Sequence, residues 1–112
     1  MKSLKKIVIA AVLTVSVHSA VGAQESAYWV VVGSIQDAGL SPRREQIIKS
    51  TRRCGFRVFN DFSDKFAGFR GGLNVFVIDI AFPTRLSAQK ALNRVKKCIP
   101  DAYIKFGSYA GE

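Results

Sequence analysis

The hydrophobic and polar positions along the chain predict four strands and two helices. The first strand is Ala27 to Ile35, "AYWVVVGSI", because β-branched and aromatic residues crowd it and a Gly-Ser turn signal closes it. A strand with one wet face alternates apolar and polar side chains, but this one is apolar at both sets of positions. Both of its faces are therefore expected to be covered, either by the protein itself or by a binding partner.

The first helix is expected soon after this strand. Residues 37–40 look like a turn, and Ser41-Pro42 is typical of a helix N-cap followed by the first helical residue. The helix should run to Cys54, with Gly55 in the left-handed position that follows many helix ends. Gly55 then begins the approach to the second strand.

The rest of the chain predicts a second helix and three more strands. Thr84 can cap this helix, which ends near Cys98 because Pro100 cannot continue it. The Gly-rich stretch 62–73 is expected to be a loop or an irregular hairpin connection. The three further strands are predicted over 56–61, 74–80 and 102–106.

The order strand, helix, strand, strand, helix, strand predicts an α+β fold of the ferredoxin-like βαββαβ type. It has a four-stranded antiparallel sheet with both helices on one face. The side chains expected beneath the helices are Tyr28, Val30, Val32, Phe56, Val58, Phe76, Ile78, Ile104 and Phe106.

The opposite sheet face has no helix left to cover it. By alternation it should carry Trp29, Val31, Arg57, Phe59, Val75, Val77, Tyr103 and Lys105. Aromatic rings beside cationic side chains form a stacking platform suited to sugars or extended polymers. Alternatively, these side chains lie beneath the segment 62–73, or in a dimer interface, and bind no ligand.

The N-terminus predicts export. Residues 1–23 combine three lysines, an uncharged run over 7–17 and small residues ending at Ala23, which is typical of a cleaved signal peptide. The apolar run is shorter than the ~20 residues of a membrane-spanning helix. The remaining residues, 24–112, are expected to form one domain that is periplasmic or secreted.

Charge narrows the choice of partners. Residues 1–23 hold three of the 17 basic residues and none of the eight acidic ones, so the mature chain carries a formal charge of +6. This suits anionic material of the cell envelope: wall polymers, lipid headgroups or an acidic protein. It can also serve solubility alone. Intracellular nucleic acid is not an expected partner of an exported protein.

Catalytic chemistry has little support in the sequence. The only histidine, His18, lies in the expected signal peptide, so the mature chain has no imidazole base or metal ligand. The carboxylates Asp61, Asp64 and Asp79 are interpreted as solvated or capping residues rather than a glycosidase pair. We therefore expect a non-enzyme without metal or cofactor.

The two cysteines, Cys54 and Cys98, are an even pair in an exported chain, which by itself favours a disulfide. The expected fold argues the other way. Its two helices run in opposite directions and each cysteine ends one of them, which places the cysteines on the order of 18 Å apart. A disulfide needs Cα atoms within ~7 Å. The prediction is that the two do not bond within one chain.

Three stretches of the chain together resemble the SPOR domain, a bacterial envelope module that binds peptidoglycan. They are "YWVVVGSI", "STRRCGFRVF" and "VFVIDIAFPTRLSAQKALNRVKKCIPDAYIK", which span nearly all of residues 27–106. The resemblance implies a βαββαβ fold and binding, on the exposed sheet face, of glycan strands stripped of stem peptides.

The resemblance also gives candidate residues. Ser34 matches the serine of the family's first-strand motif, and Val31 stands where the family commonly has a glutamine. The Gly-Pro that usually follows the third strand is Ile80-Ala81 here. The full candidate glycan-binding set is Trp29, Val31, Ser34, Arg57, Phe59, Tyr103 and Lys105. A second hypothesis is an exported protein-interaction or inhibitor domain that uses the same apolar sheet face against another envelope protein.

Overall fold

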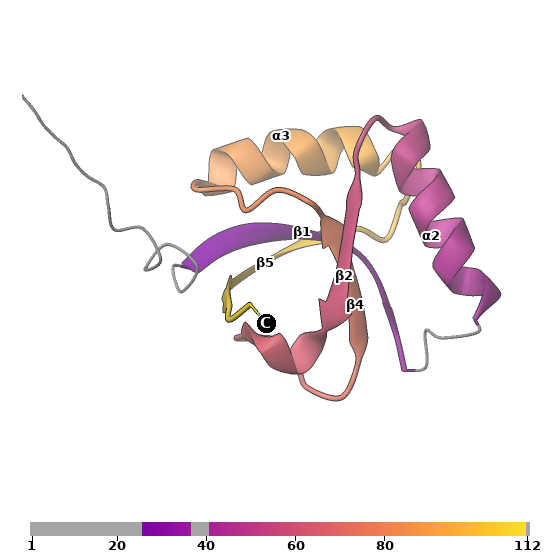
Figure 1. Cartoon of the computed structure of the whole chain (residues 1–112). Helices are drawn as coiled ribbons and strands as arrows, with labels where there is room; N and C mark the ends of the chain where they lie inside the picture. Colours follow the sequence, from indigo (N-terminus) through magenta and orange to yellow (C-terminus); the bar gives the residue numbers. More distant parts are fainter. Residues whose placement is uncertain (1–25, 37–40, 112) are drawn as a thin grey trace, which may run out of the picture.

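A computed structural model describes residues 26–36 and 41–111 (Figure 1). The expected signal peptide and the turn at 37–40 lie outside these residues. The elements are β1 (Ser26–Ile35), α2 (Pro42–Arg53), β2 (Val58–Phe62), the 3-10 turn η2 (Ser63–Lys65), β3 (Phe66–Ala67), β4 (Asn74–Ile78), α3 (Arg85–Val95) and β5 (Tyr103–Tyr109). Within the described ranges, no helix is both long and apolar enough to cross a membrane.

The strands form one curled antiparallel sheet in the order β2-β4-β1-β5-β3. The α+β class and the two helices are as predicted, but the sheet has five strands instead of four. The additional strand, β3, lies inside the stretch predicted to be a loop. Its two residues pair with the end of β5, Phe66 with Tyr109 and Ala67 with Ser108.

The segment from β2 to β3 joins the two edges of the sheet. β2 is one edge strand, η2 follows it directly, and β3 adds to the opposite edge. Gly107 permits this closure, because a Cβ at that position would collide with the carbonyl oxygen of Ala67. The sheet therefore wraps around one of its own faces, as the curled ribbon in Figure 1 shows.

Both helices pack on the other face, as predicted, and their caps follow the local signals. The Ser41 side chain accepts a hydrogen bond from the N–H of Arg43, and Thr84 accepts one from Ser87. Gly55 has the left-handed φ of +88°. The core between helices and sheet comprises Val30, Val32, Ile47, Phe76, Ile78, Phe82, Ala88, Ala91, Leu92, Val95 and Ala102.

One residue expected beneath the helices is not there. Phe106 is 53% exposed, and its ring lies against Tyr28, with 4.8 Å between the ring centroids. Tyr28 itself is half-buried and packs against the helix-side core. Phe106 therefore sits at the margin of the helix layer.

The prediction that the two cysteines do not bond is wrong. Cys54 and Cys98 form a disulfide, with Cα atoms 6.1 Å apart. The estimate assumed that the helices lie alongside each other in opposite directions. Instead α2 rises steeply beside the end of α3, so the two C-terminal ends meet (Figure 1). Cys98 also follows the last residue of α3, Val95, by three residues, and the intervening turn carries it toward α2.

Candidate functional site

The sheet face that was predicted to be uncovered is a second hydrophobic core. Trp29 is 7% exposed and Val31 is fully buried. The indole N–H of Trp29 donates a hydrogen bond of 3.1 Å to the carbonyl oxygen of Gly107, and the Phe66 ring meets the indole edge-on. Val75 and Val77 are buried in the same cluster. The expectation of an open aromatic platform is therefore wrong.

The segment 62–73 provides the cover, which was the alternative interpretation of this face. Phe66 inserts from β3 and is itself almost fully buried. It packs against Phe69 and Tyr109, at 4.7 Å and 4.9 Å between ring centroids. The pairing of β3 with β5 holds Phe66 in place. The second apolar face of β1 is therefore covered by the chain itself.

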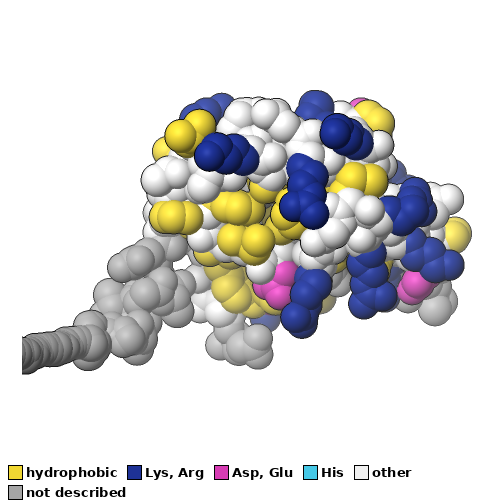
Figure 2. All heavy atoms as spheres, turned by 90° about the horizontal axis from the view of Figure 1, so that it is seen from above, with side chains coloured by type: hydrophobic (Ala, Val, Ile, Leu, Met, Phe, Trp, Pro, Cys, Tyr) yellow, Lys and Arg dark blue, Asp and Glu magenta, His cyan; other side chains and the backbone are white. Residues whose placement is uncertain are grey.

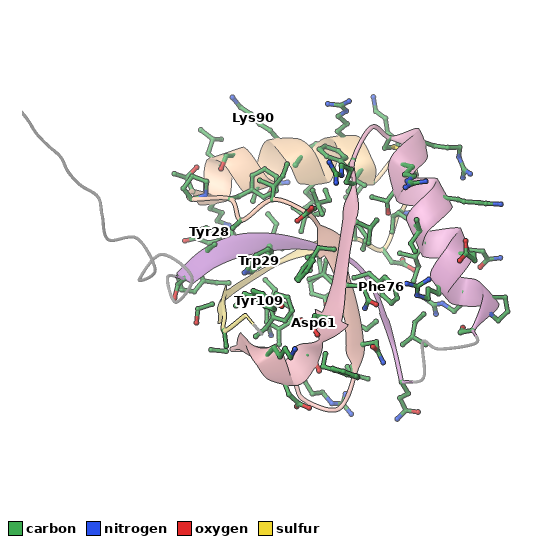
Figure 3. All side chains as sticks on the ribbon, viewed as in Figure 1. Tyr28, Trp29, Asp61, Phe76, Lys90 and Tyr109 are labelled. Carbon is green, nitrogen blue, oxygen red and sulfur yellow. A yellow bond between two sulfur atoms is a disulfide. The ribbon has the colours of Figure 1, made fainter. Side chains whose placement is uncertain are left out.

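A polar cluster ties this cover to the edge strand β2. The Tyr109 hydroxyl donates a hydrogen bond to Asp61, and the two residues are labelled in Figure 3. The Lys65 ammonium lies 3.5 Å from the same carboxylate. Burial works to raise the pKa of Asp61. Hydrogen bonds from Tyr109 and from the Phe62 N–H, together with the charge of Lys65, outweigh burial, so the pKa lies below its usual value. The ionised carboxylate thus stabilises the closed sheet.

The other candidates on this face are scattered. Phe59 is half-buried and its ring packs on Tyr109, with 5.1 Å between centroids. Arg57 precedes β2 and is exposed, and Lys105 is partly exposed opposite Trp29 in the register. Tyr103, at the start of β5, is 48% exposed. The structure does not assemble these side chains into one flat surface with Trp29.

Two of the predicted residues, Ser34 and Tyr103, line the same cleft at the end of the sheet. This cleft has a volume of about 630 Å³ and opens to solvent. Its walls come from the end of β1, from one side of α2 and from the turn before β5. The described residues that line it are Val32, Gly33, Ser34, Arg43, Gln46, Ile47, Ser50, Cys98, Ile99, Pro100, Asp101 and Tyr103.

The cleft exists because two strand pairings end at different places. Pairing of β1 with β5 stops at Val31 opposite Tyr103, whereas pairing of β1 with β4 continues to Ile35. The last residues of β1 therefore have a neighbouring strand on one side only. A register shift between Val31 and Gly33 also bends the strand at this point.

Gly33 sets how closely α2 approaches this strand. A Cβ at Gly33 would overlap the Cδ1 atom of Ile47 and lie 3.1 Å from its Cγ1 atom. The glycine of the first-strand motif is thus explained by helix packing. Since Arg43, Gln46 and Ser50 occupy the same side of α2 as Ile47, this contact also fixes the helical wall of the cleft.

The opposite wall depends on the disulfide. Cys98 lines the cleft, and Ile99, Pro100 and Asp101 follow it directly. The Cys98 and Ile99 amides both donate to the carbonyl oxygen of Val95, at 2.9 Å and 2.7 Å, which continues the turn from α3. Covalent attachment to Cys54 anchors this turn to the end of α2.

The lining of the cleft offers several kinds of binding group. It presents two hydroxyls, a carboxamide, a guanidinium, a carboxylate and one exposed aromatic ring, from Ser34, Ser50, Gln46, Arg43, Asp101 and Tyr103. These groups can donate and accept hydrogen bonds and stack on an apolar sugar face. In residues 26–36 and 41–111, no group of three or more His, Cys, Asp or Glu side chains could hold a metal.

Sequence reasoning missed four of these polar residues: Arg43, Gln46, Ser50 and Asp101. A usable signal was present in the first three, because positions i, i+3 and i+7 fall on one side of a helix. That side also contains the apolar Ile47, which packs on Gly33, so helical spacing alone does not mark it as a binding surface. Asp101 belongs to a turn whose position depends on the disulfide, and no local pattern indicates it.

Comparison of the chain with models of known protein families, with curated proteins and with solved structures finds no match.

Proposed function

We propose that this protein is an exported, non-catalytic module that binds peptidoglycan glycan strands lacking stem peptides, and that the cleft beside β1 is its binding site. The observation that carries the proposal is the lining of this cleft. An exposed tyrosine stands at one side, and hydroxyl, amide and charged side chains converge from two other elements. Hydrogen-bonding groups beside an aromatic ring are the combination that sugar recognition requires.

The cleft opens to solvent, so a polymer such as a glycan strand can reach it. Removal of the stem peptide leaves a carboxylate on the sugar's lactyl group, and Arg43 is the cation in the cleft that can bind it. Asp101 can accept hydrogen bonds from sugar hydroxyls.

The resemblance to SPOR domains and the disulfide both support the proposal of an exported peptidoglycan-binding module. The four long strands and two helices follow the βαββαβ order of the ferredoxin-like arrangement, to which β3 is an addition. Disulfides persist in oxidising compartments such as the bacterial periplasm. The Cys54–Cys98 bond therefore supports a periplasmic or secreted location after cleavage near Ala23.

The alternative, a protein-interaction or inhibitor domain, relied on the apolar sheet face. Trp29, Val31, Val75 and Val77 are buried beneath the segment 62–73, so that face offers no contact surface. The alternative would need a different surface, and capture of one strong protein partner without any binding to sacculi would favour it.

Co-sedimentation with amidase-treated sacculi tests the proposal. We expect the wild-type protein to sediment with them, and Tyr103→Ala to weaken binding about fivefold, since stacking contributes about 1 kcal/mol. Gln46→Ala should weaken binding as well, through a lost hydrogen bond. Phe62→Ala is the matched control, because Phe62 is 56% exposed and does not line the cleft. Equal sedimentation of all four proteins would contradict the assignment of the cleft.

A further inference from the structure

The cations of the chain concentrate in its helix layer. Residues 46–60, which include most of α2, contain four Lys or Arg residues and no Asp or Glu. Residues 80–100, which include all of α3, contain five and again none. A basic face of this kind attracts anionic partners over a distance of about 8–10 Å at moderate salt.

The disulfide brings the two basic segments together. It joins the C-terminal ends of α2 and α3, where Arg52, Arg53 and Arg94 occupy the last helical turns. The Arg94 guanidinium lies over the Phe56 ring, 4.9 Å from its centroid, so it also bridges the end of α3 to the segment that connects α2 with β2. The cations at the two helix ends are therefore held near one another.

Little of this charge is neutralised within the protein. Among the described residues, the ion pairs are Arg44 with Glu45 at 3.7 Å and Lys65 with Asp61 at 3.5 Å. Neither involves a cation from the two basic segments. Figure 2, which looks down on α3, shows Lys and Arg side chains spread over this face with hydrophobic side chains between them.

The outer side of α3 also carries one exposed apolar side chain, that of Leu86. Leu86, Lys90 and Asn93 fall on one helical stripe, and Lys97 follows in the turn after the helix. Leu86 is 68% exposed, and Lys90 points away from the sheet (Figure 3). A cationic helix surface with a protruding leucine is typical of elements that lie in a membrane interface.

We propose that the outer face of α3, together with the joined helix ends, docks on a membrane surface rich in anionic lipids. Lysine and arginine side chains would pair with headgroup phosphates, and Leu86 would enter the headgroup boundary. Leu86 is the reason to choose a membrane over a soluble phosphate polymer, since a polymer offers no apolar layer. The side chains named for this surface, Leu86, Lys90 and Lys97, do not line the glycan cleft.

Vesicle sedimentation tests the proposal. The full chain is expressed, the exported product is recovered, and its N-terminus is checked by mass spectrometry so that all variants share it. Binding is measured to phosphatidylglycerol vesicles and to phosphatidylcholine vesicles, at low and at high salt. We expect binding to the anionic vesicles only, and loss of that binding in high salt.

Matched variants locate the surface. Lys90→Gln with Lys97→Gln should lower the partition coefficient by on the order of tenfold or more. Arg70→Gln with Lys105→Gln removes the same charge from residues outside the helix layer and should have a much smaller effect. Leu86→Ser should weaken vesicle binding while leaving any binding to soluble polyphosphate unchanged.

Three results would overturn the proposal. They are no binding to anionic vesicles, equal loss in the two double variants, and binding to soluble polyphosphate that exceeds binding to vesicles at the same phosphate concentration. None of them depends on the sacculus experiment, so failure here leaves the glycan proposal standing.

Discussion

Cys54 and Cys98 connect the C-terminal ends of the two helices, and Cys98 is at the same time part of the cleft wall. The bond closes a loop of 44 residues, and a cross-link of this span stabilises a folded chain by about 4 kcal/mol in the chain-entropy model. The disulfide therefore has two consequences, one for overall stability and one for the site.

The first prediction concerns its removal. Cys54→Ser with Cys98→Ser should lower the free energy of unfolding by about 2–5 kcal/mol in urea titrations. Glycan affinity should fall as well, at temperatures where the variant is still folded, because the turn 98–101 loses its anchor. Wild-type protein whose disulfide has been reduced serves as the parallel measurement, and the untreated wild type is its reference. Unchanged stability after verified reduction would contradict this role.

The second prediction concerns Gly33. Gly33→Ala should destabilise the fold by about 1–3 kcal/mol, because the new methyl group overlaps the Cδ1 atom of Ile47. Ile47→Val removes that atom, so the double variant should recover part of the loss. A double-mutant cycle by thermal or urea unfolding measures the coupling. Strictly additive effects of the two substitutions would show that the close approach of β1 and α2 is not the reason why position 33 requires glycine.

The third prediction concerns acid. The pKa of Asp61 is lower in the folded chain than the value of about 3.9 expected in the unfolded chain. Its ionised form therefore adds stability that is fully present above about pH 4 and is lost as the pH falls through the folded pKa. Asp61→Asn should be less stable than wild type at pH 6, and the difference should shrink as the pH falls through the lowered pKa of the folded chain. A stability difference that does not change with pH would exclude this contribution.

The fourth prediction concerns Trp29, the only tryptophan of the chain. Because its side chain is buried and its N–H is bonded to Gly107, the fluorescence of the folded protein should be blue-shifted and protected from iodide. Addition of glycan should leave the emission unchanged. Strong quenching by iodide in the folded state would show instead that the sheet face is open.

Local sequence signals predicted the elements well, for reasons that are themselves local. Ser41 and Thr84 cap helices through bonds to residues two or three positions away, and Gly55 supplies a left-handed backbone at the same range. The alternation within strands likewise separated Trp29 from Val30. The element boundaries differ by a few residues, as with β2, which begins at Val58 instead of Phe56.

Two features depended on long-range geometry and were not predictable in this way. The angle between α2 and α3 decides whether Cys54 meets Cys98, and no pattern within either helix encodes it. β3 has two residues, too few for a periodic signal, yet its pairing with β5 buries the face on which most candidate residues lie. The non-alternating first strand did indicate that both faces are covered, and the cover comes from within the chain.

Amide chemical shifts can be followed while the isotopically labelled protein is titrated with purified glycan strands lacking stem peptides, which tests whether the cleft is the glycan site. We expect the largest changes at Ser34, Gln46, Ser50, Asp101 and Tyr103, while the amides of Val31 and Val77 on the closed sheet face move little. Strands that retain stem peptides should produce smaller changes. Absence of any shift at saturating glycan, or shifts centred on the sheet face, would contradict the assignment of the cleft as the glycan site.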